Sequence, residues 1–225
     1  MKKSLMFLLL ALCAGSLGAA PITFDSSQFQ TDTLALAGAA SDNNSDTSPP
    51  ALLPLLTTAS AASGADFADS AGSADVGFLS AFAEVGSESQ STSALGSAEF
   101  NGKFTLSGTL LRLLVNFDSL NTLDGGTAGG QILLFLAVDG TTLLNQVVDT
   151  SGMFERFFVV PVGGLGVLDL LLTSNADATG GAAFNVSAAN FSLELSEAPV
   201  LLVFATGLLG LVLMLRVRRA RRVRI

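Results

Sequence analysis

Between Ala65 and Ser196 the chain alternates short apolar runs with turn-forming residues, and this rhythm constrains the fold more than any other feature. Phe, Val, Leu and Thr, which favour strands, are prominent in the runs, while Gly, Asn, Asp and Ser separate them. No long amphipathic helix interrupts the pattern. Roughly seven to nine strands at this spacing predict a mainly β domain over 65–196, an antiparallel sandwich of jelly-roll type. Helix is expected only at the two ends of the chain.

The apolar runs also predict which faces of the strands are covered. Phe104 and Leu106 alternate with polar residues, so one face of that strand is expected to look into the core and the other to meet water. Three longer runs, at 110–117, 132–138 and 157–162, are nearly continuous in apolar residues. Such runs predict strands covered on both faces, as in the interior of a sandwich or barrel.

Two dipeptides are candidates for tight turns. Asp139-Gly140 stands between apolar runs and is the best hairpin signal in the chain, because both residues tolerate a positive φ. Asn101-Gly102 is a second candidate, although a bulge inside one long strand fits it equally well.

A change of parity near the end of the domain predicts an irregularity. Phe184, Val186 and Ala188 occupy even positions, whereas the next apolar residues, from Phe191 onward, occupy odd ones. Side chains in a strand alternate between its two faces, so a shift by one residue exchanges the faces. A bulge or turn is therefore expected near 189–190.

Residues 21–64 are rich in Ala, Ser, Thr, Asp and Asn, which predicts a low-complexity linker or loop region, with one strand near Thr33–Ala37. Asp42, Asn44 and Asp46 alternate like the opening of a calcium loop. The sixth and twelfth positions of that loop lack the required glycine and glutamate. The sequence therefore predicts no metal site.

The first 20 residues have the three zones of a secretory signal peptide. Lys2 and Lys3 are charged, 5–14 are apolar, and 15–20 are small or apolar residues. The only cysteine, Cys13, lies in this leader, so the exported chain is expected to contain no disulfide.

The rest of the chain is strongly acidic. All 19 acidic residues lie between Asp25 and Glu197, where the basic ones are only Lys103, Arg112 and Arg156. Such a domain repels nucleic acid, stays soluble and can attract cations. Most of these acids are expected to form a solvated surface.

The residue types that are missing exclude several kinds of chemistry. The chain has no His, Tyr or Trp, so imidazole bases and histidine-ligated metals are excluded. No serine-nucleophile motif is present. A pair of carboxylates could still act as catalytic groups, as in glycoside hydrolysis. Phe is the only aromatic residue available for stacking on sugars, although most Phe residues recur at the spacing expected of a strand core. No catalytic residue, metal or cofactor is predicted.

The chain ends in an uncharged run, Val200–Leu215, followed by six arginines. As a helix, its sixteen residues would cover about 24 Å, somewhat less than a hydrocarbon core of about 30 Å. Arginine-rich ends stay in the cytoplasm, so a transmembrane helix is predicted over 199–215, with the preceding domain outside. Thr206, Gly207 and Gly210 form a small-residue face on this helix for close helix packing. The cytoplasmic stop-transfer cluster is Arg216, Arg218, Arg219, Arg221, Arg222 and Arg224.

This end of the chain, over 197–225, resembles the PEP-CTERM sorting signal of Gram-negative bacteria, which has a short Pro-Glu-Pro-like motif, a thin apolar helix and an arginine cluster. Glu197-Ala198-Pro199 stands in the place of the motif and keeps its final proline. The glycine-containing core 207–211, followed by arginines, is also similar. The resemblance implies export, retention in the inner membrane during transit, and processing by an exosortase. It further implies release or attachment at the cell surface, often in species that make extracellular polysaccharide.

Three functional hypotheses remain at this stage. The first is a non-catalytic cell-surface or biofilm-matrix protein, sorted through its tail, with an exosortase, the membrane and extracellular polysaccharide as partners. The second is a permanently anchored protein that binds a carbohydrate or a cation. The third is a carboxylate-dependent enzyme that acts on polysaccharide. Nucleic acid is not expected as a partner, because the exterior is acidic.

Overall fold

The computed structural model describes residues 20–196, which form eleven strands and one short 3₁₀ helix. The predicted signal peptide, sorting motif, transmembrane helix and arginine cluster lie outside these residues, except that Ala20 is included. No helix within 20–196 has the length and apolar character needed to cross a bilayer. The elements are β1 (Ala20–Pro21), β2 (Phe24–Ala37), β3 (Ala40–Ser48), η1 (Pro50–Leu52), β4 (Leu55–Ser63), β5 (Asp66–Asp75), β6 (Phe78–Ser87), β7 (Thr92–Thr105), β8 (Leu110–Val138), β9 (Thr141–Val148), β10 (Gly152–Val159) and β11 (Leu165–Ser196).

The strands form an antiparallel sandwich of two layers, as the sequence predicts. The first sheet has the order β3, β2, β7, the first half of β11, the second half of β8, and β9. The second sheet has the order β4, β5, β6, the second half of β11, the first half of β8, and β10. Short β1 extends the second sheet beside the end of β11.

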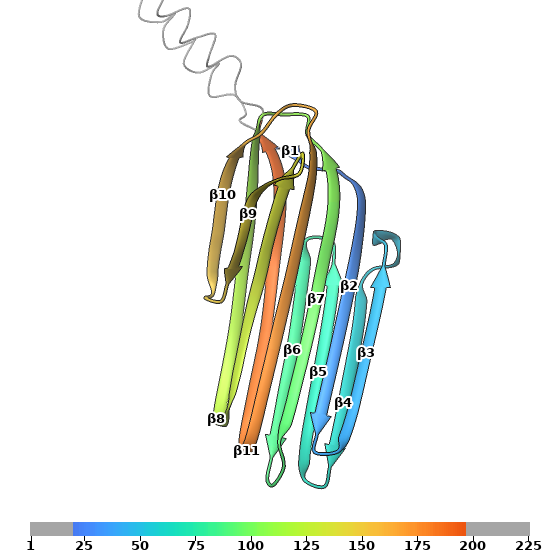
Figure 1. Ribbon diagram of the computed structural model, residues 1–225, viewed down its shortest axis with the longest axis vertical. Coiled ribbons are helices and arrows are strands. Elements are labelled where there is room, and N and C mark those ends of the chain that lie inside the picture. Colours follow the sequence, from blue (N-terminus) through green and yellow to red (C-terminus); the bar gives the residue numbers. More distant parts are fainter. Residues whose placement is uncertain (1–19, 197–225) are drawn as a thin grey trace, which may run out of the picture.

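The long strands β8 and β11 belong to both sheets because each one reverses direction at its midpoint. Figure 1 shows both reversals at the same end of the molecule, opposite the end where β1 lies. Gly125 turns β8 with φ +81°, and Gly180 and Gly181 turn β11 with φ +101° and +105°. Residues that carry a side chain rarely adopt such φ angles, so glycine is required at these points.

The core between the sheets has two chemically different halves. Beside β10 it is filled by Phe and Leu side chains, whereas beside the reversals it consists almost entirely of alanines. The sheets approach closely around the small residues: a Cβ on Gly72 would lie 2.1 Å from the carbonyl oxygen of Ser97. The alanine half contains Ala35, Ala37, Ala59, Ala61, Ala68, Ala83, Val85, Ala94, Ala176, Ala178 and Ala183.

The stretch expected to be a linker, 21–64, instead supplies β2, β3 and β4 of the sandwich. The single strand expected near Thr33–Ala37 is present, as the end of β2. Ala35 and Ala37 point inward and are completely buried. Alanine usually contributes little to a strand, but here the opposite sheet is so near that a methyl group fills the gap.

The expected hairpin at Asp139-Gly140 is confirmed: it joins β8 to β9, with φ +50° and +75°. Asn101-Gly102 is not a turn but lies inside β7. The irregularity near it is on the partner strand, where β2 has one extra residue between Phe24 and Ser26. The alternative of one long strand is therefore confirmed, and the bulge lies on the neighbouring strand, β2.

The predicted change of parity near 189–190 is wrong. The inward positions of the second half of β11 are odd throughout, and its pairing with β8 is regular there. Asn185 and Ser187 point inward and are fully buried, while Phe184 lies on the outer face against Phe82 at 5.5 Å. The buried side-chain amide of Asn185 is stabilised by hydrogen bonds: its Nδ2 donates to Ser119 Oγ at 2.8 Å, and its Oδ1 accepts from Ser187 Oγ at 2.9 Å and from Ser174 Oγ.

The predictions for the apolar runs have mixed outcomes. Phe104 and Leu106 face the core as expected. The runs 110–117 and 132–138 are strands, with one face fully buried and the other partly covered. The run 157–162 is different, because β10 ends at Val159, which is 85% exposed, and β10 is an edge strand.

Candidate functional site

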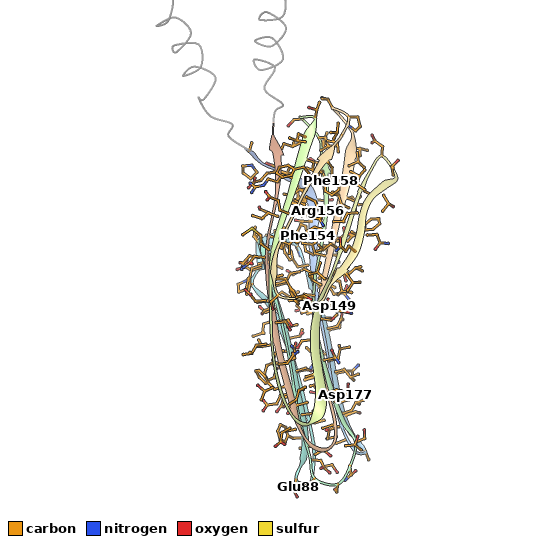
Figure 2. The ribbon with its side chains drawn as sticks, turned by 90° about the vertical axis from the view of Figure 1, so that its left-hand side faces the viewer. Glu88, Asp149, Phe154, Arg156, Phe158 and Asp177 are labelled. Carbon is orange, nitrogen blue, oxygen red and sulfur yellow. The ribbon has the colours of Figure 1, made fainter. Side chains whose placement is uncertain are left out.

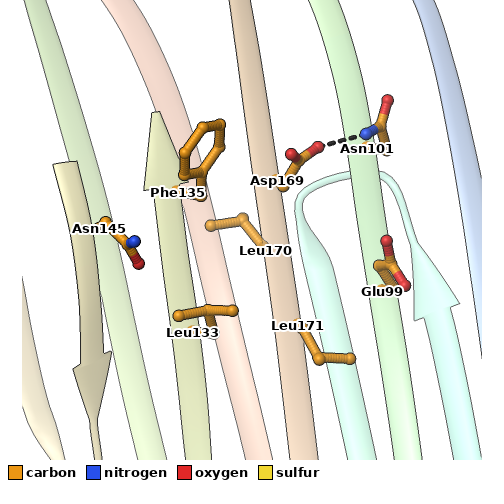
Figure 3. Close-up of a pocket in the computed structure, with 8 residues that line it drawn as sticks. All are labelled: Glu99, Asn101, Leu133, Phe135, Asn145, Asp169, Leu170 and Leu171. Carbon is orange, nitrogen blue, oxygen red and sulfur yellow. Dashed lines mark hydrogen bonds between the residues drawn. The ribbon is translucent and has the colours of Figure 1, made fainter. Parts of the chain in front are cut away.

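The outer face of the first sheet contains a groove of about 380 Å³. Strands β7, β8, β9 and β11 supply its walls and floor, and Figure 3 shows the side chains that line it. They combine two carboxylates, two amides, one aromatic ring and three leucines: Glu99, Asn101, Leu133, Phe135, Asn145, Asp169, Leu170 and Leu171.

The strand register brings these residues together in rows across the sheet. Asn101 on β7 lies opposite Asp169 on β11, which lies opposite Phe135 on β8, which in turn lies opposite Asn145 on β9. Neighbouring strands are about 4.8 Å apart, so the four side chains form one continuous row. A parallel row two residues along contains Glu99, Leu171 and Leu133.

The first row has a polar side and an apolar side. Asn101 Nδ2 donates a hydrogen bond to Asp169 Oδ1, which holds the carboxylate in place. Phe135 is half-buried beside it, and Asn145 follows on the far side (Figure 3). An aromatic surface is thus flanked by hydrogen-bonding groups on both sides.

The two carboxylates of the groove are held in an unfavourable environment for negative charge. Burial raises the pKa of Glu99 above its ordinary value of 4.5, and the negative charges of Asp169 and Asp32 raise it further. Burial likewise raises the pKa of Asp169 above 3.8, and the positive charge of Lys103 opposes this shift. The folded chain therefore binds more protons than the unfolded chain just above these ordinary values. In that window the free energy of unfolding decreases as the pH rises.

The other basic residues of the described chain are engaged on the second sheet. Arg112 forms ion pairs with Glu155 at 2.7 Å and Glu194 at 2.9 Å. Its pKa is raised, chiefly by the hydrogen bond to Glu155 and then by that to Glu194. Arg156 lies over the ring of Phe154, with 4.5 Å between the guanidinium carbon and the ring centroid (Figure 2). Neither arginine therefore balances the acids of the groove.

The calcium-like alternation at Asp42, Asn44 and Asp46 has a structural use. It falls on β3, where Asp42 Oδ2 accepts a hydrogen bond from the Ser60 amide at 3.0 Å, and the Asn44 amide donates to the Thr58 carbonyl. These bonds join the edge strands β3 and β4 of the two sheets. Within 20–196 no group of three or more acidic, His or Cys side chains is placed to hold a metal ion.

Sequence reasoning selected none of the groove-lining residues as functional, and it considered Asn101 only as part of a turn or bulge. The sorting motif, the helix packing face and the arginine cluster, which it did select, all lie outside the described residues. One local signal was available: Asp169 is the only charged residue in the apolar run 165–172. A charge on a strand that is otherwise apolar marks a face with a polar use.

Comparison with known proteins leaves the family open. No family model matches the chain, and no curated protein matches its sequence. Solved structures with partial likeness include the carbohydrate-binding module TmCBM61 in complex with β-1,4-galactotriose, with 13% identity and a TM-score of 0.25, covering 56% of this chain and 86% of that one. The VP2 subviral particle of infectious bursal disease virus has 10% identity and a TM-score of 0.20, covering 90% and 75%. Scores this low establish neither a shared fold nor a shared ligand.

Proposed function

We propose that this protein is an exported, non-catalytic cell-surface or matrix protein whose sandwich binds a carbohydrate chain in the groove of the first sheet. The observation that carries the proposal is the row of Asn101, Asp169, Phe135 and Asn145. A sugar ring has an apolar face of C–H groups and an edge of hydroxyls. The ring of Phe135 suits the first, while the amides and carboxylate suit the second.

The size and position of the groove support this ligand class. Its volume of about 380 Å³ falls within the range of about 300–1,000 Å³ for ligand sites. Because it lies on the outer face of the strands, its ends are not enclosed, so a polymer can continue beyond it. Its apolar floor with a few convergent polar groups is typical of small-molecule sites.

Sugar binding is tested by replacing Phe135 with alanine in the full-length protein, purified in detergent. We expect the affinity for the glycan that the parent binds best to fall about 2–10-fold, since aromatic contacts contribute about 0.5–1.5 kcal/mol beyond their buried area. Affinity is measured by calorimetry over a panel of oligosaccharides. Phe157→Ala, an exposed ring on the second sheet, is the matched control and should bind like the parent.

Two results would contradict this part of the proposal. One is a parent protein that retains no oligosaccharide of the panel at millimolar concentration, and the other is an equal loss in the Phe135 and Phe157 variants. The same samples are checked for shortened oligosaccharides. Turnover that disappears in Glu99→Gln would assign the groove to a carboxylate-dependent enzyme instead.

Export and sorting form a separate part of the proposal, supported by the leader and by the PEP-CTERM-like tail. Pro199→Ala keeps the apolar run intact, so we expect insertion to continue while the unprocessed membrane-bound form accumulates and the surface form decreases. Blots of cell fractions, in a host that processes such tails, measure this. Replacing the six tail arginines with Gln should instead move unprocessed protein to the soluble fraction, because the arginines stop translocation. If Pro199→Ala changes neither size nor fraction, the permanently anchored alternative is favoured.

We also propose that the sandwich is of jelly-roll type. In that architecture a pair of antiparallel strands wraps around both layers. The pairing of β8 with β11 continues from Leu110 to Val138 across both sheets, interrupted only at the reversals, which supports this assignment.

A further inference from the structure

We infer that the groove selects a cationic sugar chain, one with free amino groups such as a glucosamine polymer. The inference rests on the proposed function, that this groove binds carbohydrate. The charges that surround Phe135 indicate which class of sugar the groove would bind. The observations that carry it are the positions of three carboxylates, the presence of only one basic residue, Lys103, that acts on Asp169 within the described chain, and the arrangement of the remaining groups.

Three carboxylates share the outer face on adjacent strands of the first sheet. Glu99 on β7 and Asp169 on β11 line the groove directly. Asp32, on β2, adds its negative charge from beyond Glu99, and its Oδ2 accepts a hydrogen bond from Gln30 Nε2 at 2.8 Å. The ligand side of this face is therefore bordered by negative charge on three neighbouring strands.

Little within the described chain neutralises these charges. Lys103 is the only basic residue that acts on Asp169, and Arg112 and Arg156 are engaged on the second sheet. An ammonium group on the ligand would supply the missing positive charge through charge-assisted hydrogen bonds. A sugar acid or sulfated sugar would meet repulsion at the same position.

The rest of the groove suits an amino sugar as well. An ammonium group near the face of Phe135 gains a cation–π attraction, which a neutral hydroxyl does not. The hydroxyls of the sugar ring can bond to the Asn145 amide and to the carbonyl oxygen of the Asn101 amide. The nitrogen of the Asn101 amide is already bonded to Asp169. Charge therefore provides selectivity, while the aromatic ring and amides provide general affinity for sugar.

The test compares four hexasaccharides by calorimetry with the full-length protein in detergent at pH 6 and low salt: glucosamine, N-acetylglucosamine, glucose and galacturonate oligomers. The parent is expected to bind the glucosamine hexamer about tenfold more tightly than either neutral hexamer, and the galacturonate hexamer least. In the double variant Glu99→Gln, Asp169→Asn the affinity for the glucosamine hexamer should fall about tenfold more than the affinity for the neutral hexamers, so that the preference is lost. Added salt should weaken the binding of the glucosamine hexamer and leave the binding of the neutral hexamers unchanged.

The control is Asp177→Asn, which removes one charge from an exposed position of β11, the strand of Asp169, but eight residues closer to the reversal (Figure 2). It should keep the parent's preference. Folding of the double variant is checked by thermal melting. At pH 7 the double variant should melt no lower than the parent, because it lacks two carboxylates whose pKa values are raised in the folded state and whose ionisation therefore disfavours folding. The difference in melting temperature between the two proteins should diminish toward pH 4, where these carboxylates of the parent take up protons.

The outcomes separate this inference from the proposed function. Equal affinity for glucosamine and neutral hexamers overturns the inference and leaves sugar binding intact. No binding of any hexamer overturns both. An equal loss of preference in Asp177→Asn would show that the overall acidity of the protein attracts the cation, and the groove would then have no selectivity of its own.

Discussion

Replacing Gly96 with alanine is expected to destabilise the protein by about 3 kcal/mol or more, at or above the usual range for overpacking of about 1–3 kcal/mol. A Cβ at this position would lie 2.2 Å from the carbonyl oxygen of Ala71 and 2.5 Å from that of Phe82. Both atoms belong to the backbone of the opposite sheet, so no side chain can rotate away. The sheets would have to separate, and the alanine half of the core would lose its contacts.

Gly129→Ala is the matched control for this prediction. Its Cβ would meet only the Asn175 side chain, at 3.6 Å, which is an ordinary contact. We expect Gly129→Ala to unfold in urea close to the parent midpoint, and Gly96→Ala to unfold at a much lower concentration or to be recovered only as aggregate. Equal midpoints for the two variants would contradict the close approach of the sheets.

Truncating Phe104 to alanine is expected to cost about 3–5 kcal/mol of the free energy of unfolding, the usual range for a buried phenylalanine. Its ring is 1% exposed and packs edge-on against Phe24 at 5.7 Å. It also fills the space above Gly166, where an added Cβ would lie 2.1 Å from the ring. The ladders to β2 and β11 hold β7 on both sides, so the cavity cannot collapse.

Lys103→Ala, one residue away on the outer face, is the control and should change the free energy of unfolding by no more than about 0.5 kcal/mol. Chemical denaturation followed by far-ultraviolet circular dichroism measures both variants. A cost for Phe104→Ala as small as that for Lys103→Ala would mean that this half of the core is not tightly packed.

Several features were predictable because they depend on neighbours in sequence. The alternation around Phe104 identified a strand and its buried face, and Asp139-Gly140 identified a hairpin through the φ values that Asp and Gly tolerate. The scarcity of helix followed from the short apolar runs. The excess of acid over base in residues 25–197 is likewise a property of composition alone.

Other features were decided only by contacts between distant parts of the chain. Ala59 and Ala61 form strand rather than linker because the opposite sheet lies close enough to bury a methyl group. The Asn185 side chain can face inward because Ser119 and Ser174 satisfy the hydrogen bonds of its amide, and this overrides the apolar pattern that predicted a bulge.

The groove belongs to this second group. The sequence by itself determined a mainly β domain with an excess of acidic residues, but it did not single out Glu99 or Asp169 among them. Only the tertiary structure decided that they share one face, since Asn101 and Asp169 meet across 68 residues of chain. The physical reason is that strand register depends on pairing between remote segments, and a shift of one residue in β7 or β11 would turn the groove side chains of that strand into the core.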